Sequence, residues 1–342
     1  MKARLFVLFA AAFLAATTVR AQGVDLQRCP PGTRTGVLGI PDATKASQDA
    51  CQKAIDLFQY MAPQLGISIT GGNATLGRGG TLGGLGHFSI GVRVNAVQGS
   101  IPQISDVRPQ VDTAHSSRYD TKSQIIGLPT ADLAIGIFKG LPLAITNVGG
   151  IDLLVSAAYL PEFNSSGISV KVPNGSLKLG YGARVGLLQE SLLVPGVSVT
   201  YLKRDLPTVD IAATANSGAD SLIVEDLSLK TTAWRVVASK SILLFRLAAG
   251  FGQDTYESST NVRAYVAATA LNPEAKAGPV AMSQNLKRTN VFADLSLNLL
   301  LLKLTGEIGQ VSGGTINTFN TFSGKQAADS RIYGSVGARF GF

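Results

Sequence analysis

The sequence predicts an all-β chain: a transmembrane antiparallel β-barrel of about 12 strands, with a range of about 10 to 14, and a short N-terminal helical segment. Three observations support this prediction. The chain is 45% hydrophobic and only 15% charged, and 38 of its 342 residues are glycine. Beyond residue 21, no apolar stretch reaches the roughly 20 residues that a spanning helix needs. From about residue 64 onward, apolar and polar residues alternate, as in strands with one face toward lipid.

Residues 1–21 have the pattern of a secretory signal peptide. Lys2 and Arg4 form the charged region, residues 5–16 are apolar, and Val19 and Ala21 place small residues before an expected cleavage site. The alternative interpretation is an uncleaved anchor helix.

Cys29 and Cys51 are the only two cysteines, and both follow the expected cleavage site. Export favours a disulfide between them, which would add about 3 kcal/mol in the chain-entropy model. The alternative, a metal site, would need a neighbouring histidine, and neither cysteine has one. We expect neither a metal nor a cofactor.

The segment 22–63 precedes the predicted barrel, which covers residues 64–342. Residues 22–42 are rich in Pro and Gly and predict an irregular arm. Residues 43–62 predict a helix, because apolar residues recur on one face, and Pro63 and Gly66 are expected to end it. We expect this helix to lie in or under the periplasmic mouth of the barrel, as a plug or a cap.

The alternation of apolar and polar residues predicts where the strands lie. Residues 87–97, 177–187 and 289–298 alternate most regularly, and the further candidates are 131–139, 151–160, 196–204, 221–238, 242–254, 300–310 and 330–342. Two more strands are expected at 66–70 and 261–268. Short connections after residues 139, 187, 238 and 298 predict the periplasmic end, and the long polar connections predict the outer end.

The last predicted strand places four apolar side chains on one face: Val336, Ala338, Phe340 and Phe342. With its signal peptide, the chain here resembles Gram-negative outer-membrane β-barrel proteins, whose last strand alternates and ends in phenylalanine. The resemblance implies location in the outer membrane of a Gram-negative bacterium, with outer-membrane lipid as a partner. It also implies that these four residues form a signal for the barrel-assembly machinery.

The order of helix and barrel is similar to the layout of the long-chain fatty-acid transporter family, whose barrels carry an N-terminal hatch and pass hydrophobic molecules. No motif of that family can be carried over residue by residue. The similarity implies a small hydrophobic ligand and nothing about which residues bind it.

The strand alternation assigns eleven charged residues to the lumen: Arg93, Asp132, Asp152, Lys178, Arg184, Lys230, Arg246, Asp294, Lys303, Glu307 and Arg339. They would form either a charge ladder in a polar passage or paired charges in a filled lumen, and we favour the filled lumen.

One predicted strand does not fit the alternation. If Leu227, Leu229, Thr231 and Ala233 face lipid, Arg235 does so too. Either a bulge swaps the faces there, or Arg235 lies at the inner headgroup level. Trp234, Tyr201 and Tyr159 are candidates for the interfacial aromatic belts.

Other functions find little support. The basic residues form no tract, so we expect no nucleic-acid partner. The Gly-rich residues 71–86 lack the context of a phosphate loop and predict a flexible link or a bent strand. The two histidines, His87 and His115, belong to no recognisable catalytic set, so we do not expect an enzyme. We expect passive transport of small or hydrophobic solutes. The alternatives are a structural or surface-interaction barrel and an outer-membrane hydrolase.

Overall fold

The computed structural model describes residue 29 and residues 43–103, 116–165, 168–215, 219–268 and 274–341. The predicted signal peptide, His115, Phe342 and the arm at 22–42 apart from Cys29 lie outside the described residues. Within the described ranges, no helix is both long and apolar enough to cross a membrane.

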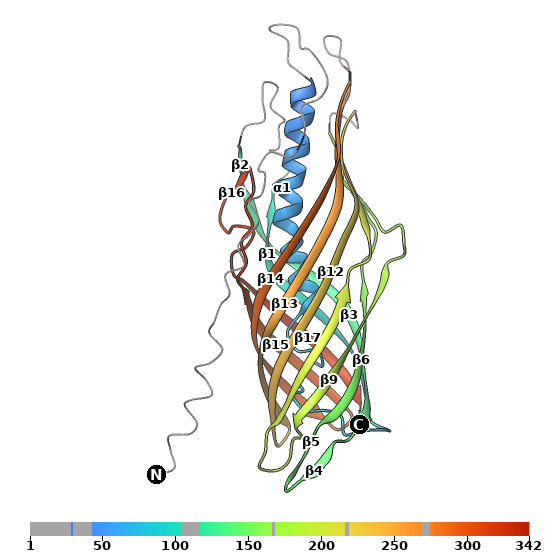
Figure 1. Ribbon diagram of the computed structural model, residues 1–342, viewed down its shortest axis with the longest axis vertical. Coiled ribbons are helices and arrows are strands. Elements are labelled where there is room, and N and C mark those ends of the chain that lie inside the picture. The colour runs from blue at the N-terminus through green and yellow to red at the C-terminus, as the bar shows by residue number, and fades with distance from the viewer. Residues whose placement is uncertain are drawn as a thin grey trace.

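In the described part of the chain, ten antiparallel strands form a ring of hydrogen bonds (Figure 1). Their order is β10-β9-β6-β3-β1-β17-β15-β14-β13-β12, and pairing between β10 and β12 joins the two ends. The strands are β1 (Phe88–Pro102), β3 (Thr121–Phe138), β6 (Gly150–Tyr159), β9 (Leu177–Leu188), β10 (Gly196–Asp205), β12 (Asp220–Ile242), β13 (Phe245–Val266), β14 (Ala275–Leu299), β15 (Leu302–Ser312) and β17 (Arg331–Gly341). This is the β-barrel class that the sequence predicts.

Shorter strands extend the wall at one end of the ring. β11 (Val209–Ala215) pairs with β12, and β8 (Ile168–Lys171) and β7 (Phe163–Ser165) continue the sheet outward from it. We call this three-stranded extension the side panel. The remaining elements are a parallel pair, β2 (Arg118–Tyr119) with β16 (Thr321–Phe322), and a hairpin, β4 (Leu141–Leu143) with β5 (Thr146–Val148).

The ring has ten strands, which lies within the predicted range of 10 to 14. It has fewer than the expected twelve because two expected strands do not exist as separate elements in the described chain. Residues 66–70 belong to helix α1 (Ala43–Thr70), and residues 261–266 continue β13 without a turn. Long uninterrupted strands, up to 25 residues in β14, extend beyond the ring where the sequence predicts long polar connections.

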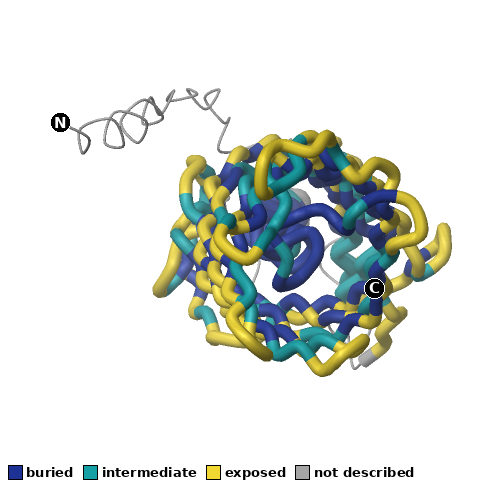
Figure 2. The backbone as a smooth tube through the Cα atoms, turned by 90° about the horizontal axis from the view of Figure 1, so that it is seen from below, coloured by how far each residue is buried: buried dark blue, intermediate teal, exposed yellow. Residues whose placement is uncertain are grey.

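The outer face of the ring is apolar, and burial alternates along the strands (Figure 2). Exposed outward side chains include Val92, Leu179, Tyr181, Ile308 and Val336, each more than 60% exposed. On the same face, Tyr201 lies directly opposite Trp234 on the neighbouring strand. An exposed apolar surface of this extent is the face that a bilayer would cover.

Helix α1 is longer than predicted, and it does not lie at the end of the short connections, which is the end that the sequence predicts to face the periplasm (Figure 1). It runs from Ala43 to Thr70, through Pro63, and lies inside the wall at the end opposite the short connections (Figure 1). At Gly66, a Cβ atom would come within 2.9 Å of the Tyr256 ring, so glycine permits close packing here and does not end the helix. Packing inside the wall therefore overrides the local signals for a helix end.

A β-bulge in β12 reverses the alternation of inward and outward residues, so the faces predicted for that strand are wrong. The pairing with β13 shifts between Glu225 and Ser228, and Asp226 has a φ of 52°. Leu222 and Val224 face inward before the bulge. From Leu227 onward, the buried residues are Leu227, Leu229, Thr231, Ala233, Arg235, Val237 and Ser239. Arg235 therefore lies in the lumen, and Lys230, predicted to face the lumen, is exposed on the outer face.

Strand β17 completes the ring by pairing with both β1 and β15. Val336 and Phe340 are exposed on its outer face, and Ala338 is half-buried on the same face. The role of this face in barrel assembly stays a prediction.

The outward apolar face predicts that charge is tolerated only near its edges. Ile308→Arg should lower the free energy of unfolding by roughly 2–4 kcal/mol, the cost of a basic side chain near the bilayer midplane. Gln310→Arg, on the same face of β15 but nearer its end, should cost about 1 kcal/mol or less. Urea unfolding in lipid vesicles, followed by the fluorescence of the single tryptophan, measures both. Equal costs would contradict this orientation of β15.

Candidate functional site

The lumen is occupied by the chain itself. After α1, residues 71–86 pass along the inner wall toward the short connections, where β1 begins (Figures 1 and 2). We call residues 71–86 the lumen segment. Most of it has no regular secondary structure, so its buried peptide groups need partners from the wall.

Carboxylates of the wall accept hydrogen bonds from the peptide N–H groups of the lumen segment. Glu307 accepts from the N–H groups of Gly72 and Asn73, at 2.8 and 2.7 Å. Asp294 accepts from the Gly77 N–H and from the Asn73 side-chain amide. Asp152 accepts similarly from the Leu82 N–H.

Arginines of the wall donate to carbonyl groups at the end of α1 and at the start of the lumen segment. Arg235 donates to the carbonyl oxygens of Gly71 and Gly72, both at 3.0 Å. Arg93 donates to the Asn73 carbonyl at 2.7 Å, and Arg204 donates to the Thr70 carbonyl at 2.9 Å. Buried charges and buried peptide groups therefore satisfy each other.

Charged residues of the wall also form ion pairs with one another between strands, on the inner face of the wall. Arg235 lies 2.5 Å from Asp254, and Arg184 lies 2.7 Å from Asp152. Asp132 bridges two arginines, Arg93 at 2.8 Å and Arg204 at 3.0 Å. Such pairing limits the cost of burying these charges.

Close contact with the wall requires glycine at particular positions of the lumen segment. At Gly77, where φ is 71°, a Cβ atom would lie 1.9 Å from the Ser296 hydroxyl oxygen. At Gly79 it would lie 2.5 Å from the Ser239 peptide nitrogen. At these positions tight packing requires glycine, and the segment is an irregular chain packed against the wall instead of the flexible link or bent strand that the sequence predicts.

The structure places nine of the eleven charged residues predicted for the lumen inside the wall. Six are buried: Arg93, Asp152, Arg184, Asp294, Glu307 and Arg339. Asp132, Arg246 and Lys303 are half-buried. Lys178 is exposed at the end of β9, and Lys230 is exposed on the outer face.

Sequence reasoning did not select Arg204, Asp254 or Asn73, and it left Arg235 unassigned. Arg204 and Asp254 lie in predicted strands. The alternation of inward and outward residues that assigned other charged residues to the lumen would have assigned these two as well. Asn73 carries no such signal, because its role depends on a contact with Asp294, 221 residues away.

An apolar chamber lies between α1 and the wall at the end with the long connections. Its helix side includes Leu57, Phe58 and Met61, and its wall side includes Ile126 and Leu229. Further wall residues come from β11 and β12: Val209, Ile211, Ala213, Leu222, Val224 and Leu227. The chamber has a cavity volume of about 390 Å³. A concave apolar cavity of this size suits a small hydrophobic molecule.

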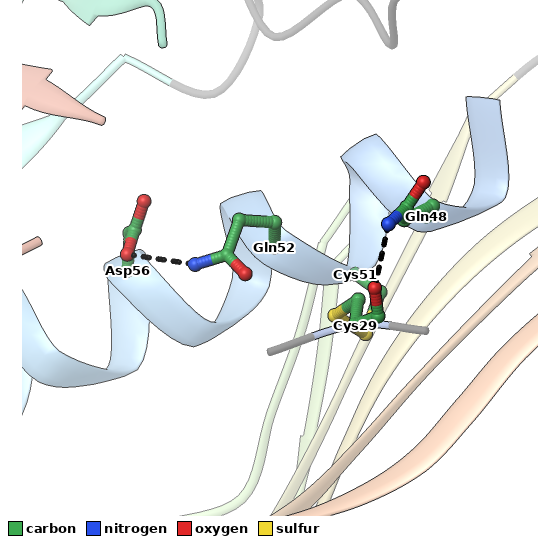
Figure 3. Close-up of a disulfide and its surroundings, with 5 residues drawn as sticks. All are labelled: Cys29, Gln48, Cys51, Gln52 and Asp56. Atoms are coloured by element: carbon green, nitrogen blue, oxygen red, sulfur yellow. Dashed lines mark hydrogen bonds between the residues drawn. A yellow bond between two sulfur atoms is a disulfide. The ribbon is translucent and has the colours of Figure 1, made fainter. Parts of the chain in front are cut away.

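The disulfide between Cys29 and Cys51 forms, as predicted, and both cysteines are buried (Figure 3). They pack with Val262 and Ala277 near the ends of β13 and β14. The side-chain amide of Gln48 donates to the Cys29 carbonyl oxygen at 2.7 Å. These contacts hold the first half of α1 against the long strands.

Farther along α1, Asp56 connects the helix to the connection between β15 and β17. Its carboxylate accepts from the peptide N–H groups of Phe319 and Asn320, at 3.1 and 2.7 Å. Burial raises the pKa of Asp56 to about 6, even though the hydrogen bonds from Asn320 and Phe319 act to lower it. Tyr60 stacks on Phe322 nearby, with ring centroids 4.0 Å apart.

No protein-family model and no curated protein matches the chain. Several solved structures of outer-membrane proteins align with this chain at low similarity. Outer-membrane expressed OmpT of Vibrio cholerae has 10% identity and a TM-score of 0.21, covering 75% of this chain and 97% of that one. The outer membrane channel DcaP of Acinetobacter baumannii has 11% identity and a TM-score of 0.20, covering 75% and 96%. An anion-selective porin from Comamonas acidovorans has 10% identity and a TM-score of 0.18, covering 75% and 98%.

These likenesses are too low to support an argument about function. The class follows from the geometry: the ring of strands, the apolar outer face and the polar, occupied lumen define a β-barrel of the outer-membrane type.

The buried pairs of the wall predict a strong effect of removing one partner. Asp254→Ala should lower the free energy of unfolding by about 3–5 kcal/mol, because Arg235 then stays buried without its carboxylate. Glu225→Ala breaks the exposed pair with Arg263 and should cost about 1 kcal/mol or less. Urea unfolding in vesicles measures both. A cost for Asp254→Ala as small as that of the control would refute the pairing.

Proposed function

We propose that this protein lies in the outer membrane of a Gram-negative bacterium, binds small hydrophobic solutes in the chamber and passes them across that membrane. The observation that carries the proposal is the apolar chamber between α1 and the wall. Apolar side chains that face the lumen do not contact lipid, so the bilayer does not stabilise them. Their position between α1 and the wall is instead suited to contact with an apolar solute.

The outer apolar face and strand β17 support the location. The outer face would contact lipid, and the outward side chains of β17 would be the part that the barrel-assembly machinery reads. The proposal includes no catalytic step.

If the chamber binds apolar solutes, a lysine should weaken binding at one position of β12 and not at its neighbour. Val224 lines the chamber, and Ile223 lies on the opposite face of the strand. Val224→Lys should weaken binding of the fluorescent apolar probe N-phenylnaphthylamine by about tenfold or more, since an ammonium group in an apolar cavity disfavours apolar ligands. Ile223→Lys serves as the matched control and should bind as the wild type does. Equal affinity of the two variants would argue against the chamber as the binding site.

A second candidate function is a structural barrel that carries no solute, and the network around the lumen segment favours it. Charge-assisted bonds from Glu307, Asp294, Arg235 and Arg93 hold the segment in place. Polar solutes and ions that enter the lumen would therefore meet the segment.

Planar-bilayer recordings separate the two candidates. The intact protein should conduct weakly, and the double variant Glu307→Gln, Asp294→Asn should open more often. The variant replaces both carboxylates, so each bond to the segment loses its charge assistance. The double variant Glu225→Gln, Asp220→Asn, at the far end of β12, is the control and should leave conductance unchanged. If the lumen variant conducts no more than the intact protein, the structural barrel is supported.

A further inference from the structure

The turns at the short-connection end of the ring carry exposed apolar side chains. Leu192, Leu243 and Leu300 lie at the tips of three hairpins and are 91%, 95% and 96% exposed. The hairpin of β4 and β5, which connects β3 to β6 at the same end (Figure 1), exposes Leu141 and Leu143. We call the exposed apolar positions at this end the apolar rim: residues 85, 141–145, 192–193, 243–244 and 300–301.

Two leucines of the apolar rim have a backbone conformation that leucine rarely adopts. Leu243 has a φ of 54° and Leu300 has a φ of 53°, both in the left-handed region. Glycine and asparagine are the usual residues of tight hairpin turns with positive φ. A turn in water would be more stable with either of them. Leucine at both tips therefore indicates that its side chain contacts something outside the chain.

The apolar outer face of the wall continues into the apolar rim without a polar border. On β14 the outward side chains from Val291 to Leu299 are apolar, and the next outward residue toward the long connections is Thr289. On β13 the outward residues between 245 and 251 are apolar, and Gln253 follows, directly opposite Thr289. The apolar face therefore has a polar border toward the long connections and none toward the short ones.

The strands alone are too short for a complete apolar band. Residues 291–299 of β14 rise about 20 Å along the barrel axis, at roughly 3.4 Å per residue and a tilt of about 40°. The apolar band of outer-membrane barrels is about 25 Å tall. The difference of about 5 Å corresponds to roughly two further residues, and the apolar rim supplies them.

Peptide groups of the apolar rim have partners within the protein. The Leu244 carbonyl accepts from the Asn298 N–H, and the Leu301 carbonyl accepts from the Gly341 N–H. In the hydrocarbon region of a bilayer, backbone polar groups must be satisfied internally, because no water reaches them. These bonds meet that condition at two of the turns.

Charged side chains near the apolar rim are compatible with lipid around it. Lys240 donates to the Leu192 carbonyl, and Lys303 donates to the Gly341 carbonyl, so both ammonium groups have acceptors. Lys139 is exposed beside the rim. A lysine stem can lie along apolar surroundings while its ammonium group reaches the headgroup layer.

We propose that the apolar rim lies within the bilayer and contacts the acyl chains of the leaflet at that end, so that the barrel ends in lipid and not in water. The proposal rests on the proposed membrane location and goes beyond it, because the location alone would allow these turns to lie in water. An apolar solute that leaves the lumen at this end would then enter lipid without crossing water.

Tryptophan fluorescence in vesicles tests the proposal. In the full chain folded into phosphatidylcholine vesicles, Trp234→Phe removes the single native tryptophan, and Leu300→Trp then reports on the apolar rim. Phosphatidylcholine with brominated acyl chains should quench this tryptophan, and iodide on both sides of the membrane should not. Leu192→Trp repeats the measurement in a second turn if Leu300→Trp does not fold.

Two further variants in the same background separate a failure of this proposal from a failure of the membrane location. Leu295→Trp, on the outward face of β14, should be quenched by brominated lipid, and Thr315→Trp, exposed in the connection between β15 and β17, should be quenched by iodide. If Leu295→Trp responds to brominated lipid but both rim variants respond only to iodide, the rim faces water or a protein partner, and the proposal is overturned while the location stands. If brominated lipid quenches none of them, the location fails and the proposal fails with it.

The left-handed turns give a second measurement whose sign decides. Asparagine fits a positive φ better than leucine does, so in water the double variant Leu243→Asn, Leu300→Asn should raise the urea midpoint of unfolding. In lipid the two amides would lose their hydration, so the midpoint in vesicles should fall. A higher midpoint would contradict the proposal. The fluorescence of the native Trp234 follows this unfolding.

Discussion

The structure depends on one constraint: the peptide groups of an irregular segment inside a barrel must find hydrogen-bond partners. The lumen segment lacks regular structure over most of its length, and water does not reach most of it. The charged residues of the wall meet this need, with Glu307 accepting from two N–H groups and Arg235 donating to two carbonyls. The charged residues of the lumen therefore do not line an open passage. They fix the position of the lumen segment, which fills that space.

The same constraint divides the lumen along its length. Near the long connections, α1 satisfies its own peptide groups, so the wall opposite it can be apolar and the chamber forms. In the middle, where the helix has ended, acids and bases of the wall bind the lumen segment and each other. Near the short connections the acids are fewer than the bases, and Arg339 has no partner in the described chain.

The sequence predicts the strands well because a lipid-facing wall imposes a period of two, and the disulfide follows from there being only two cysteines. It fails where tertiary contacts decide. Pro63 predicts a helix end, but packing inside the wall carries α1 on to Thr70. The bulge at Glu225–Ser228 reverses the faces of β12, so Arg235 and Leu229 point inward and Lys230 outward. The bonds between Asn73 and Asp294 and between Asp56 and Asn320 join residues more than 200 positions apart, and no local pattern predicts them.

The strength of the hydrogen bonds between the wall and the lumen segment determines how easily a solute could pass through the lumen. Each hydrogen bond from a charged group contributes about 1.5–3 kcal/mol, so displacing the lumen segment as a unit would cost more than thermal motion supplies. A solute in the chamber is therefore separated from the short-connection end by a barrier that belongs to the protein. Lowering this barrier requires an interaction that favours the displaced segment over the bound one, because a ligand shifts an equilibrium only by its differential affinity. The disulfide and the Asp56 contacts hold α1 at the long-connection end, so the lumen segment, which follows Thr70, is the part that such an interaction would have to displace.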